Sequence, residues 1–313
     1  MKRKTPRSAL IAAAALVLAF AASCGDTPGS PNVSAPWADL MPMQRVAPGT
    51  FTLGESLGTW NGDGGSNESN LTQVTLTQGF YMGRYPVTWG QWVAVMLWNP
   101  NGIPFLPSGW IPAPANQQEI DAGFDMSRRP ATHVSWYDAI VFANRLSIMR
   151  GLTPAYELPD AYPSYTSWSS DPDTWGAVPT SLNNGRWNAA RIASGNPTGY
   201  RLPTEAQWEF AAKGGVTGET FTFSGSNTVG DVAWTWENSE FGGIRSPRMV
   251  GLLDANGLGL HDMSGNVLEW VQDWYDAYPG TPQYDPVGAA SGLFVRVLRG
   301  GSWGGGASHA RSV

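Results

Sequence analysis

Hydrophobic and polar residues alternate in a short stretch near the start of the folded part of the chain. In residues 49–54, Phe51 and Leu53 are separated by threonine, a period of two that predicts a half-buried strand after a turn. We expect residues 74–82 to form its partner strand. Residues 60–70 are rich in Gly, Asn and Ser and are expected to form a loop between the two strands.

Three later stretches change to helical spacing, and each begins with a capping box. In this pattern, side chains of the first turn satisfy backbone N–H groups that have no partner in the helix. The pairs are Thr88 with Gln91, Ser135 with Asp138, and Thr204 with Gln207. Apolar residues follow at the spacing of one helix face, which predicts that they face the core. They are Trp92, Val95 and Met96, then Ala139, Phe142, Ala143 and Leu146, and finally Trp208, Ala211 and Ala212. Gly151 and Gly214 are expected to end the second and third helices.

Two long segments between these helices, residues 98–130 and 153–199, show no regular period. Loops of this length are uncommon in a compact domain unless they carry function or shape a surface. Their many aromatic residues are interpreted in two ways: as an exposed binding face, or as side chains that fold inward and hold the loops on the core.

Composition supports a loop-rich globular protein. The chain has 313 residues, 42% hydrophobic and 14% charged, with 38 Gly, 24 Pro and 16 Trp. So much Gly and Pro argues against a strongly helical protein, while the aromatics argue against disorder. The isoelectric point is near 5.1. Because no basic stripe is present, a nucleic-acid partner is not expected.

The first 24 residues are expected to be a signal peptide. Four Lys and Arg residues precede an uncharged apolar run at 9–22 that is short for a membrane span. The run ends in small residues before Cys24, the one cysteine of the chain. This resembles a bacterial lipobox, with Ala21 where leucine is usual. We favour lipidation of Cys24 and a lipid anchor in the bacterial cell envelope, periplasmic or surface-exposed. The alternative is an ordinary cleaved signal and a secreted protein.

Residues 25–42 are expected to form a flexible tether because Gly, Pro, Ser and Asn dominate their first half. The folded domain is expected over residues 43–313. Removal of the signal peptide lowers the Lys and Arg count from 19 to 15 against 25 Asp and Glu, which makes the exported part more acidic.

Residues 257–270, GLGLHDMSGNVLEW, hold turn residues, two carboxylates and a large aromatic. In a tight turn, Asp262 and Glu269 can converge on one point together with backbone carbonyls. Calcium prefers such a cage, with six to eight oxygen ligands. The alternative is a glycine-rich hairpin with two solvated acids.

Three motifs together carry a family resemblance. They are RLPTEAQWEFAAKG at 201–214, GLGLHDMSGNVLEW at 257–270 and VLRGGSW at 297–303. Earlier segments agree: GTFTLG at 49–54, YPVT at 85–88 and PATHVSW at 130–136. In this order they resemble the sulfatase-modifying factor family, whose best-known member is the formylglycine-generating enzyme. The resemblance implies a single α+β domain, a variant of the C-type-lectin-like fold with much irregular structure.

The resemblance also implies a structural calcium site. Its ligands would be Asp262, the backbone carbonyls of Gly265 and Val267, and Glu269. A second family calcium site would lie within residues 224–243, with ligands that the sequence does not identify.

The catalytic centre of the family is expected to be absent. The formylglycine-generating enzyme holds copper(I) on two cysteines just beyond the Gly-Gly-Ser motif, and soft thiolates suit that ion. Those positions correspond here to Gly305 and Ala310, so neither copper nor formylglycine-generating oxidase activity is expected. Trp270 and Ser302 match residues that line the family's groove. With His309 nearby, these three residues could line a remaining pocket or simply pack.

The family normally continues beyond this sequence to a Gly-Phe-Arg strand, so the domain is expected to be truncated at its C-terminus. Two functions remain open. One is a calcium-stabilised binding or scaffold module for an unidentified protein, peptide or glycan, anchored to the membrane through Cys24. The other is a periplasmic oxidoreductase or protein-modifying enzyme of the same family with altered chemistry.

Overall fold

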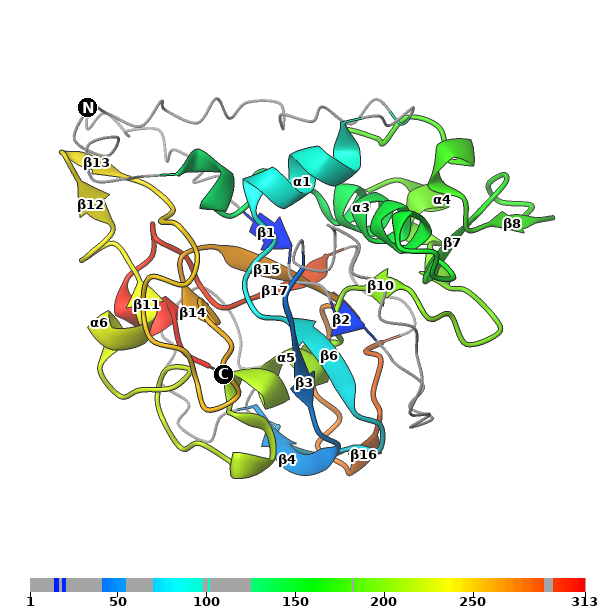
Figure 1. The fold of residues 1–313 in the computed structure, drawn as a ribbon. Helices are drawn as coiled ribbons and strands as arrows, with labels where there is room; N and C mark the ends of the chain where they lie inside the picture. Colours follow the sequence, from blue (N-terminus) through cyan, green and yellow to red (C-terminus); the bar gives the residue numbers. More distant parts are fainter. Residues whose placement is uncertain are drawn as a thin grey trace, which may run out of the picture.

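The computed structural model describes residues 41–54, 70–97, 101, 125–181, 183–289 and 295–312, together with the backbone of residues 14–16 and 19–20. Short helices and several small sheets are joined by long connections (Figure 1). This mixture agrees with the predicted α+β class and its large share of irregular structure.

All three predicted capping boxes are confirmed. The α-helices are α1 (Trp89–Met96), α3 (Trp136–Met149), α4 (Gly185–Asn188), α5 (Glu205–Ala212) and α6 (Val229–Val232). The first, second and fourth of these begin with the reciprocal side-chain bonds of a capping box. Every apolar residue expected on their inner faces is buried. Short 3-10 turns lie at η2 (Met126–Arg128), η3 (Pro172–Thr174), η4 (Gly215–Thr217) and η5 (Ala307–His309).

Strands pair in small groups. In the first half of the chain they are β1 (Ala14–Leu16), β2 (Ala19–Phe20), β3 (Met43–Val46), β4 (Gly49–Leu53), β5 (Thr72–Leu76), β6 (Phe80–Gly83), β7 (Tyr156–Pro159) and β8 (Trp168–Ser169). In the second half they are β9 (Arg191–Ile192), β10 (Tyr200–Arg201), β11 (Ala233–Trp234), β12 (Glu240–Phe241), β13 (Ile244–Arg245), β14 (Ser264–Gly265), β15 (Leu268–Trp274), β16 (Gln283–Tyr284) and β17 (Arg296–Arg299). The sheet orders are β1-β15-β17, β10-β2-β6-β3, β16-β5-β4 and β8-β7-β9, with two further pairs, β11-β14 and β12-β13.

The predicted hairpin of residues 49–54 with 74–82 is correct in part. Strand β4 pairs with β5 in antiparallel register, Phe51 opposite Val74. The prediction of one continuous strand over residues 74–82 is wrong. Strand β5 ends at Leu76, and the following strand, β6, pairs with β3 instead. At the break, the backbone N–H of Thr77 leaves the ladder and donates to Asp285 Oδ1 at 2.8 Å.

Two apolar clusters form most of the core. One lies between α1, α3 and the segment 155–202, where the rings of Trp92 and Phe142 stack with centroids 5.1 Å apart. The other joins α5 to strands β4, β5, β6 and β15 around Trp208 and Phe210. The second cluster buries α5 against residues of the glycine-rich motif and of β15, among them Met263 and Val271.

Both interpretations of the aromatic segment 153–199 hold for different residues. Trp175 and Trp187 are buried, with rings that meet edge to face at 5.8 Å. Tyr162 is 61% exposed, and Tyr165 lies beside it at a centroid distance of 5.9 Å. Residues 102–124 of the other long segment lie outside the described residues.

Residues 14–16 and 19–20, from the stretch expected to be a signal peptide, pair with strands of the domain. Cys24 and most of the expected tether lie outside the described residues. None of the helices in the described part of the chain is long and apolar enough to cross a membrane.

Candidate functional site

The glycine-rich motif folds into a turn and strands that face the core. Its backbone takes positive φ at Asp262 (58°), Gly265 (73°) and Asn266 (57°). A Cβ on Gly265 would lie 2.4 Å from the carbonyl oxygen of Trp234, so only glycine fits there. The motif then continues into β15, whose inner face carries Glu269, Val271 and Asp273.

Asp262 is buried and joins the turn to the preceding segment at residues 248–251. Its Oδ2 accepts from the backbone N–H of Gly251 at 2.8 Å, and its Oδ1 accepts from Asn266 Nδ2 at 3.0 Å. The Asn266 side chain also accepts from the backbone N–H of Arg248 at 2.9 Å. Burial raises the pKa of Asp262. Both carboxylate oxygens keep further lone pairs, so they can still accept a cation.

Glu269 is completely buried and only half satisfied. Its Oε2 accepts from Trp208 Nε1 at 2.5 Å, while Oε1 has no hydrogen-bond partner among the described residues. Burial raises the pKa of Glu269 to about 8; the Trp208 hydrogen bond opposes this rise and the nearby Asp262 adds to it. A buried carboxylate in this state requires a proton or a cation.

Gly300 lies close to two backbone carbonyls of the motif and to Trp208, the hydrogen-bond donor to Glu269. A Cβ added to Gly300 would lie 3.3 Å from the Met263 carbonyl oxygen and 3.8 Å from that of Val267. It would also touch the Trp208 ring at 3.4 Å. Glu269 Oε1 without a hydrogen-bond partner and the nearby buried Asp262 supply carboxylate oxygens, the ligand type that calcium prefers. The carbonyls of Gly265 and Val267 stay predicted ligands.

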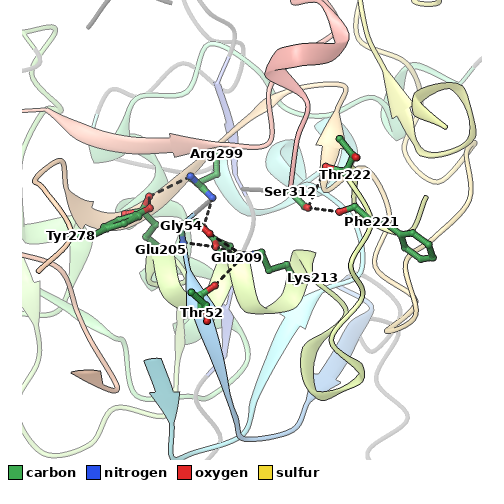
Figure 2. A network of polar contacts seen from close by, with 10 residues as sticks. All are labelled: Thr52, Gly54, Glu205, Glu209, Lys213, Phe221, Thr222, Tyr278, Arg299 and Ser312. Atoms are coloured by element: carbon green, nitrogen blue, oxygen red, sulfur yellow. Dashed lines mark hydrogen bonds and ion pairs between the residues drawn. The ribbon is translucent and has the colours of Figure 1, made fainter. Parts of the chain in front are cut away.

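Arg299, the cationic residue opposite Glu269 in the sheet, forms its ion pairs with other carboxylates. Arg299 lies opposite Glu269 in the β15–β17 register, yet its guanidinium contacts Glu209 at 2.7 Å and Glu205 at 3.5 Å. Figure 2 shows Arg299 between these two acids of α5. Glu209 also accepts from the Gly54 backbone at 2.9 Å and from Lys213 at 2.7 Å. This network joins α5 to β4 and β17, and it leaves the charge of Glu269 unmatched.

Sequence reasoning missed this network. Glu205 and Glu209 are four residues apart on α5, and both are buried. Their position on the same helix face as the apolar Trp208 and Ala212 could have indicated two buried acids. Asp273 was missed as well. It lies on β15 and accepts a hydrogen bond from the backbone N–H of Glu205 at 2.9 Å.

The second calcium region, residues 224–243, supplies no evident ligand group. Glu240 pairs with Arg245 at 2.7 Å, and Asp231 accepts from Ser226 at 2.9 Å. Throughout the described ranges, no group of three or more His, Cys, Asp and Glu side chains could hold a metal. The second site stays a prediction without named ligands.

The three pocket residues lie in different settings. The Trp270 indole donates to the Val134 carbonyl at 2.8 Å and is half-buried. Ser302 and His309 belong to one loop, and a Cβ on Gly305 would lie 3.5 Å from both the Ser302 carbonyl and His309 Cβ. His309 itself is exposed. Whether the three residues bind a common ligand stays a prediction.

The two positions expected to lack cysteines are also placed. The Gly305 carbonyl accepts from the backbone N–H of Trp236 at 2.8 Å. Ala310 is 1% exposed and packs in an apolar cluster with Phe223, Val232 and Ala233. Neither residue offers a side-chain atom that could bind a metal.

Comparisons with known proteins agree with the motifs. A family model for the sulfatase-modifying factor enzyme 1-like domain matches residues 33–313. The chain is 35% identical over 243 residues to the chaperone protein LppX of Paenibacillus barcinonensis. This match covers 74% of this chain and 71% of LppX. It is 39% identical over 128 residues to a formylglycine-generating enzyme of Streptomyces coelicolor, a match that spans 37% of this chain and 40% of the enzyme. Among solved structures, Treponema denticola variable protein 1 aligns with a TM-score of 0.66 and 32% identity over 86% of each chain.

Proposed function

The chain belongs to the family of sulfatase-modifying factor enzyme 1-like domains, and within it we propose a lipid-anchored envelope module that binds unfolded polypeptide and does not generate formylglycine. The family and the single α+β domain predicted from the motifs are confirmed. The activity, the ligand and the anchor are proposals.

The observation that carries this proposal is the environment of Ala310. The family's enzymes use a thiolate at this position, and here a buried methyl group packs among Phe223, Val232 and Ala233. The protein therefore keeps the fold of the family without the soft ligands that copper(I) requires. Because a fold alone does not determine function, a binding role agrees best with this site.

Similarity to a protein described as a chaperone supports polypeptide as the ligand class. This relative matches over more than two thirds of both chains, so the comparison involves most of the domain. Exposed aromatic side chains, among them Tyr162 and Tyr165, add adhesive surface of the kind that contacts unfolded chains.

A bound calcium ion would stabilise the domain rather than take part in a reaction. Asp262, Glu269 and the carbonyls of Gly265 and Val267 would hold it, and the orphaned Oε1 of Glu269 supports this assignment. The ion would neutralise the carboxylate that Arg299 does not reach.

The anchor is proposed at Cys24 in the bacterial cell envelope, with secretion as the alternative. Support comes from the charged start, the apolar run and the small residues before the cysteine. Expression of the full chain and of Cys24→Ser in a bacterial host tests it. The wild type should enter the detergent-soluble membrane fraction, while Cys24→Ser should appear in the soluble exported fraction. Equal partition of both would contradict the anchor.

The polypeptide-binding role is tested with the full chain and reduced insulin, whose B chain aggregates and scatters light. The protein should suppress scattering in proportion to its concentration, whereas serum albumin at equal mass should not. Oxygen uptake with a cysteine-containing sulfatase peptide and copper is measured in parallel and should stay at background. Undiminished scattering would overturn the binding role, and oxygen-dependent loss of the peptide thiol would overturn the absence of chemistry.

The alternative of an enzyme with altered chemistry has no comparable support in the described residues. His309 is exposed, and its Nδ1 lies 3.4 Å from the neighbouring Ser308 hydroxyl. The described ranges contain no cluster of metal-ligating side chains to supply a redox centre.

A further inference from the structure

The hairpin of β7 and β8 presents three aromatic side chains in a row. Its connection, residues 160–167, reads DAYPSYTS, and Trp168 begins β8. The ring centroids of Tyr162 and Tyr165 lie 5.9 Å apart, and those of Tyr165 and Trp168 lie 5.8 Å apart. Figure 1 shows β7 and β8 projecting from the side of the domain near α4. Tyr162, Tyr165 and Trp168 are called the aromatic row below.

We propose that the aromatic row is a binding site for an extended, uncharged and proline-rich segment of a partner polypeptide. This inference rests on the proposed polypeptide-binding function. It names the surface that performs this function and the kind of segment that the surface recognises.

The two tyrosines of the row are exposed, although their positions are fixed. Tyr162 is 61% exposed and Tyr165 is 36% exposed. A Cβ on Gly185 would lie 2.9 Å from the Tyr162 ring, so this ring rests on the backbone at the start of α4. An aromatic ring that is already held in place loses little conformational entropy when a ligand covers it.

Asp160 holds the loop that carries the tyrosines. Its Oδ1 accepts from the backbone N–H groups of Ala161 at 2.8 Å, Thr166 at 3.1 Å and Ser167 at 3.2 Å. Its Oδ2 accepts from the Thr166 hydroxyl at 2.5 Å. The backbone N–H of Asp160 donates to the Ser167 carbonyl at 2.9 Å, which closes the loop. The loop is therefore organised before any ligand binds.

Tyr165 has a backbone conformation that a bulky side chain resists. Its φ is 41°, in the left-handed region that glycine and asparagine tolerate better. Because its ring is partly exposed, packing in the core does not explain a tyrosine at this position. Strained residues of this kind cluster at ligand-binding sites, so the strain at Tyr165 supports a binding role for the ring.

The spacing of the rings fits a polypeptide in the polyproline II conformation. This helix rises about 3.1 Å per residue, so every second residue advances about 6.2 Å. The centroid separations of 5.9 Å and 5.8 Å are close to that step. Polyproline II is also a major conformer of unfolded chains, and aromatic surfaces recognise it in other proteins.

The tilt of the rings favours a polypeptide over a polysaccharide. The planes of Tyr162 and Tyr165 meet at 64°, and those of Tyr165 and Trp168 meet at 39°. Tilted neighbours form notches, which accept a pyrrolidine ring or an aliphatic side chain. The face of a sugar ring stacks best on a flat platform, which these angles do not provide.

The charges around the row favour an uncharged segment. Residues 161–170 contain no charged side chain. At the Trp168 end, the guanidinium of Arg191 covers the indole at 3.6 Å and pairs with Glu157 at 2.6 Å. Both carboxylate oxygens of Asp160 are bonded within the loop. A charged side chain of the partner would lose hydration here without gaining an unpaired opposite charge.

The experiment measures the binding of two fluorescein-labelled peptides to the full chain by fluorescence anisotropy. One peptide repeats Ala-Pro-Pro, and the other has serine in place of every proline. The proline peptide should bind at least about tenfold more tightly, because its extended conformation exists before binding. Equal binding of the two peptides would overturn the preference for a proline-rich segment.

Two substitutions in the row test the site. Tyr165→Asn suits the positive φ, so Tm should stay the same or rise, while binding of the proline peptide weakens at least about tenfold. Tyr162→Ser should weaken binding to a similar degree. A residue that only supports the fold would instead lower Tm when it is replaced. Tyr284→Ser is the matched control, because Tyr284 is 73% exposed in β16 of another sheet, and it should bind as the wild type does.

Asp160 is a positioning residue, and hydrogen exchange measures its effect. In Asp160→Ala, the amides of Thr166 and Ser167 should exchange faster, and the proline peptide should bind more weakly although all three rings remain. In the wild type, the same two amides should exchange more slowly when the peptide is added. Unchanged exchange on addition of the peptide would contradict this location of the site.

The remaining outcomes separate the row from the function. Equal binding by the wild type and Tyr162→Ser/Tyr165→Asn would overturn the row as the site. Retention of the wild type on insoluble chitin through the two tyrosines, without peptide binding, would assign the row to a glycan and overturn the polypeptide. If the double variant suppresses insulin aggregation as well as the wild type, the function stands and the row is wrong. If the wild type binds neither reduced insulin nor either peptide, the function itself fails.

Discussion

The indole N–H of Trp208 donates to Oε2 of Glu269 at 2.5 Å, and Oε1 of the same buried carboxylate has no hydrogen-bond partner among the described residues. A core tryptophan thus fixes one oxygen of an acid whose other oxygen is buried without a hydrogen bond. The sequence and the family resemblance both predict Glu269 as a calcium ligand, and its unpaired Oε1 supports that proposal.

Calcium should stabilise the wild type through Glu269. At calcium concentrations about 100 times Kd, the expected gain is roughly 2.7 kcal/mol, or about 5–10 °C in Tm for a domain of this size. Glu269→Gln keeps the shape and the acceptor for Trp208 but removes the charge, so most of the gain should disappear. Differential scanning fluorimetry with calcium and with EGTA measures both proteins.

Glu240→Gln is the matched control, because Glu240 pairs with Arg245 at the surface. It should respond to calcium as the wild type does. An equal calcium response in Glu269→Gln and the wild type would remove the site at residues 262–269.

Arg299 should be among the most costly residues to remove. It lies 6% exposed between Glu209 and Glu205 (Figure 2). Arg299→Ala leaves two buried acids without their guanidinium, which should cost about 3–5 kcal/mol. Urea unfolding measures the loss. Arg245→Ala, at the more exposed pair with Glu240, should cost under about 1 kcal/mol. Similar costs for both would show that the buried network contributes little.

Asp273 should make stability depend on pH. Burial raises its pKa to about 7, and the nearby Glu205 carboxylate adds to the rise. The native state therefore holds a proton that the unfolded state has lost above its pKa of about 4. The resulting stability is fully present below that pH and is lost as the pH rises through about 7, by at most about 4 kcal/mol.

Asp273→Asn keeps an acceptor for the Glu205 backbone N–H but cannot titrate. The free energy of unfolding in EGTA, measured from pH 5 to pH 8, should fall less steeply for the variant than for the wild type. Parallel profiles would show that Asp273 does not carry this pH dependence.

Restoring the two cysteines should restore copper(I) binding. Gly305 accepts a Cβ without a close contact, with 3.5 Å to the nearest atoms, and a thiol at Ala310 would replace a methyl group in an apolar cluster. Gly305→Cys/Ala310→Cys should bind about one copper(I) per chain in competition with a chromogenic chelator. Each single variant should bind much more weakly. No binding by the double variant would contradict the assignment of these two positions.

Local patterns in the sequence predicted the helices well. The first-turn pairs of α1, α3 and α5 act within four residues, so their hydrogen bonds do not depend on the rest of the fold. Strand β4 was also predicted from a local pattern, the alternation of Phe51 and Leu53 with threonine. The turn at residues 262–266 was also readable, because its glycine marks a backbone that other residues resist.

Contacts between distant segments were not predictable in this way. The break between β5 and β6 is stabilised by Asp285, more than two hundred residues later. The bonds of Glu209 to Gly54 and Arg299 join three separate parts of the chain. Hydrophobic periodicity within a short segment does not indicate such pairs. An acidic residue is predicted to lie at the surface unless its buried partner is known.

Native mass spectrometry of the full chain with reduced, unfolded α-lactalbumin tests the central claim most directly, because one spectrum reports binding, metal content and any chemical change. We predict a complex of the two proteins that retains one calcium ion, with no copper, and a client of unaltered mass. The absence of a complex, or a client whose cysteine has been converted to formylglycine, would contradict the account.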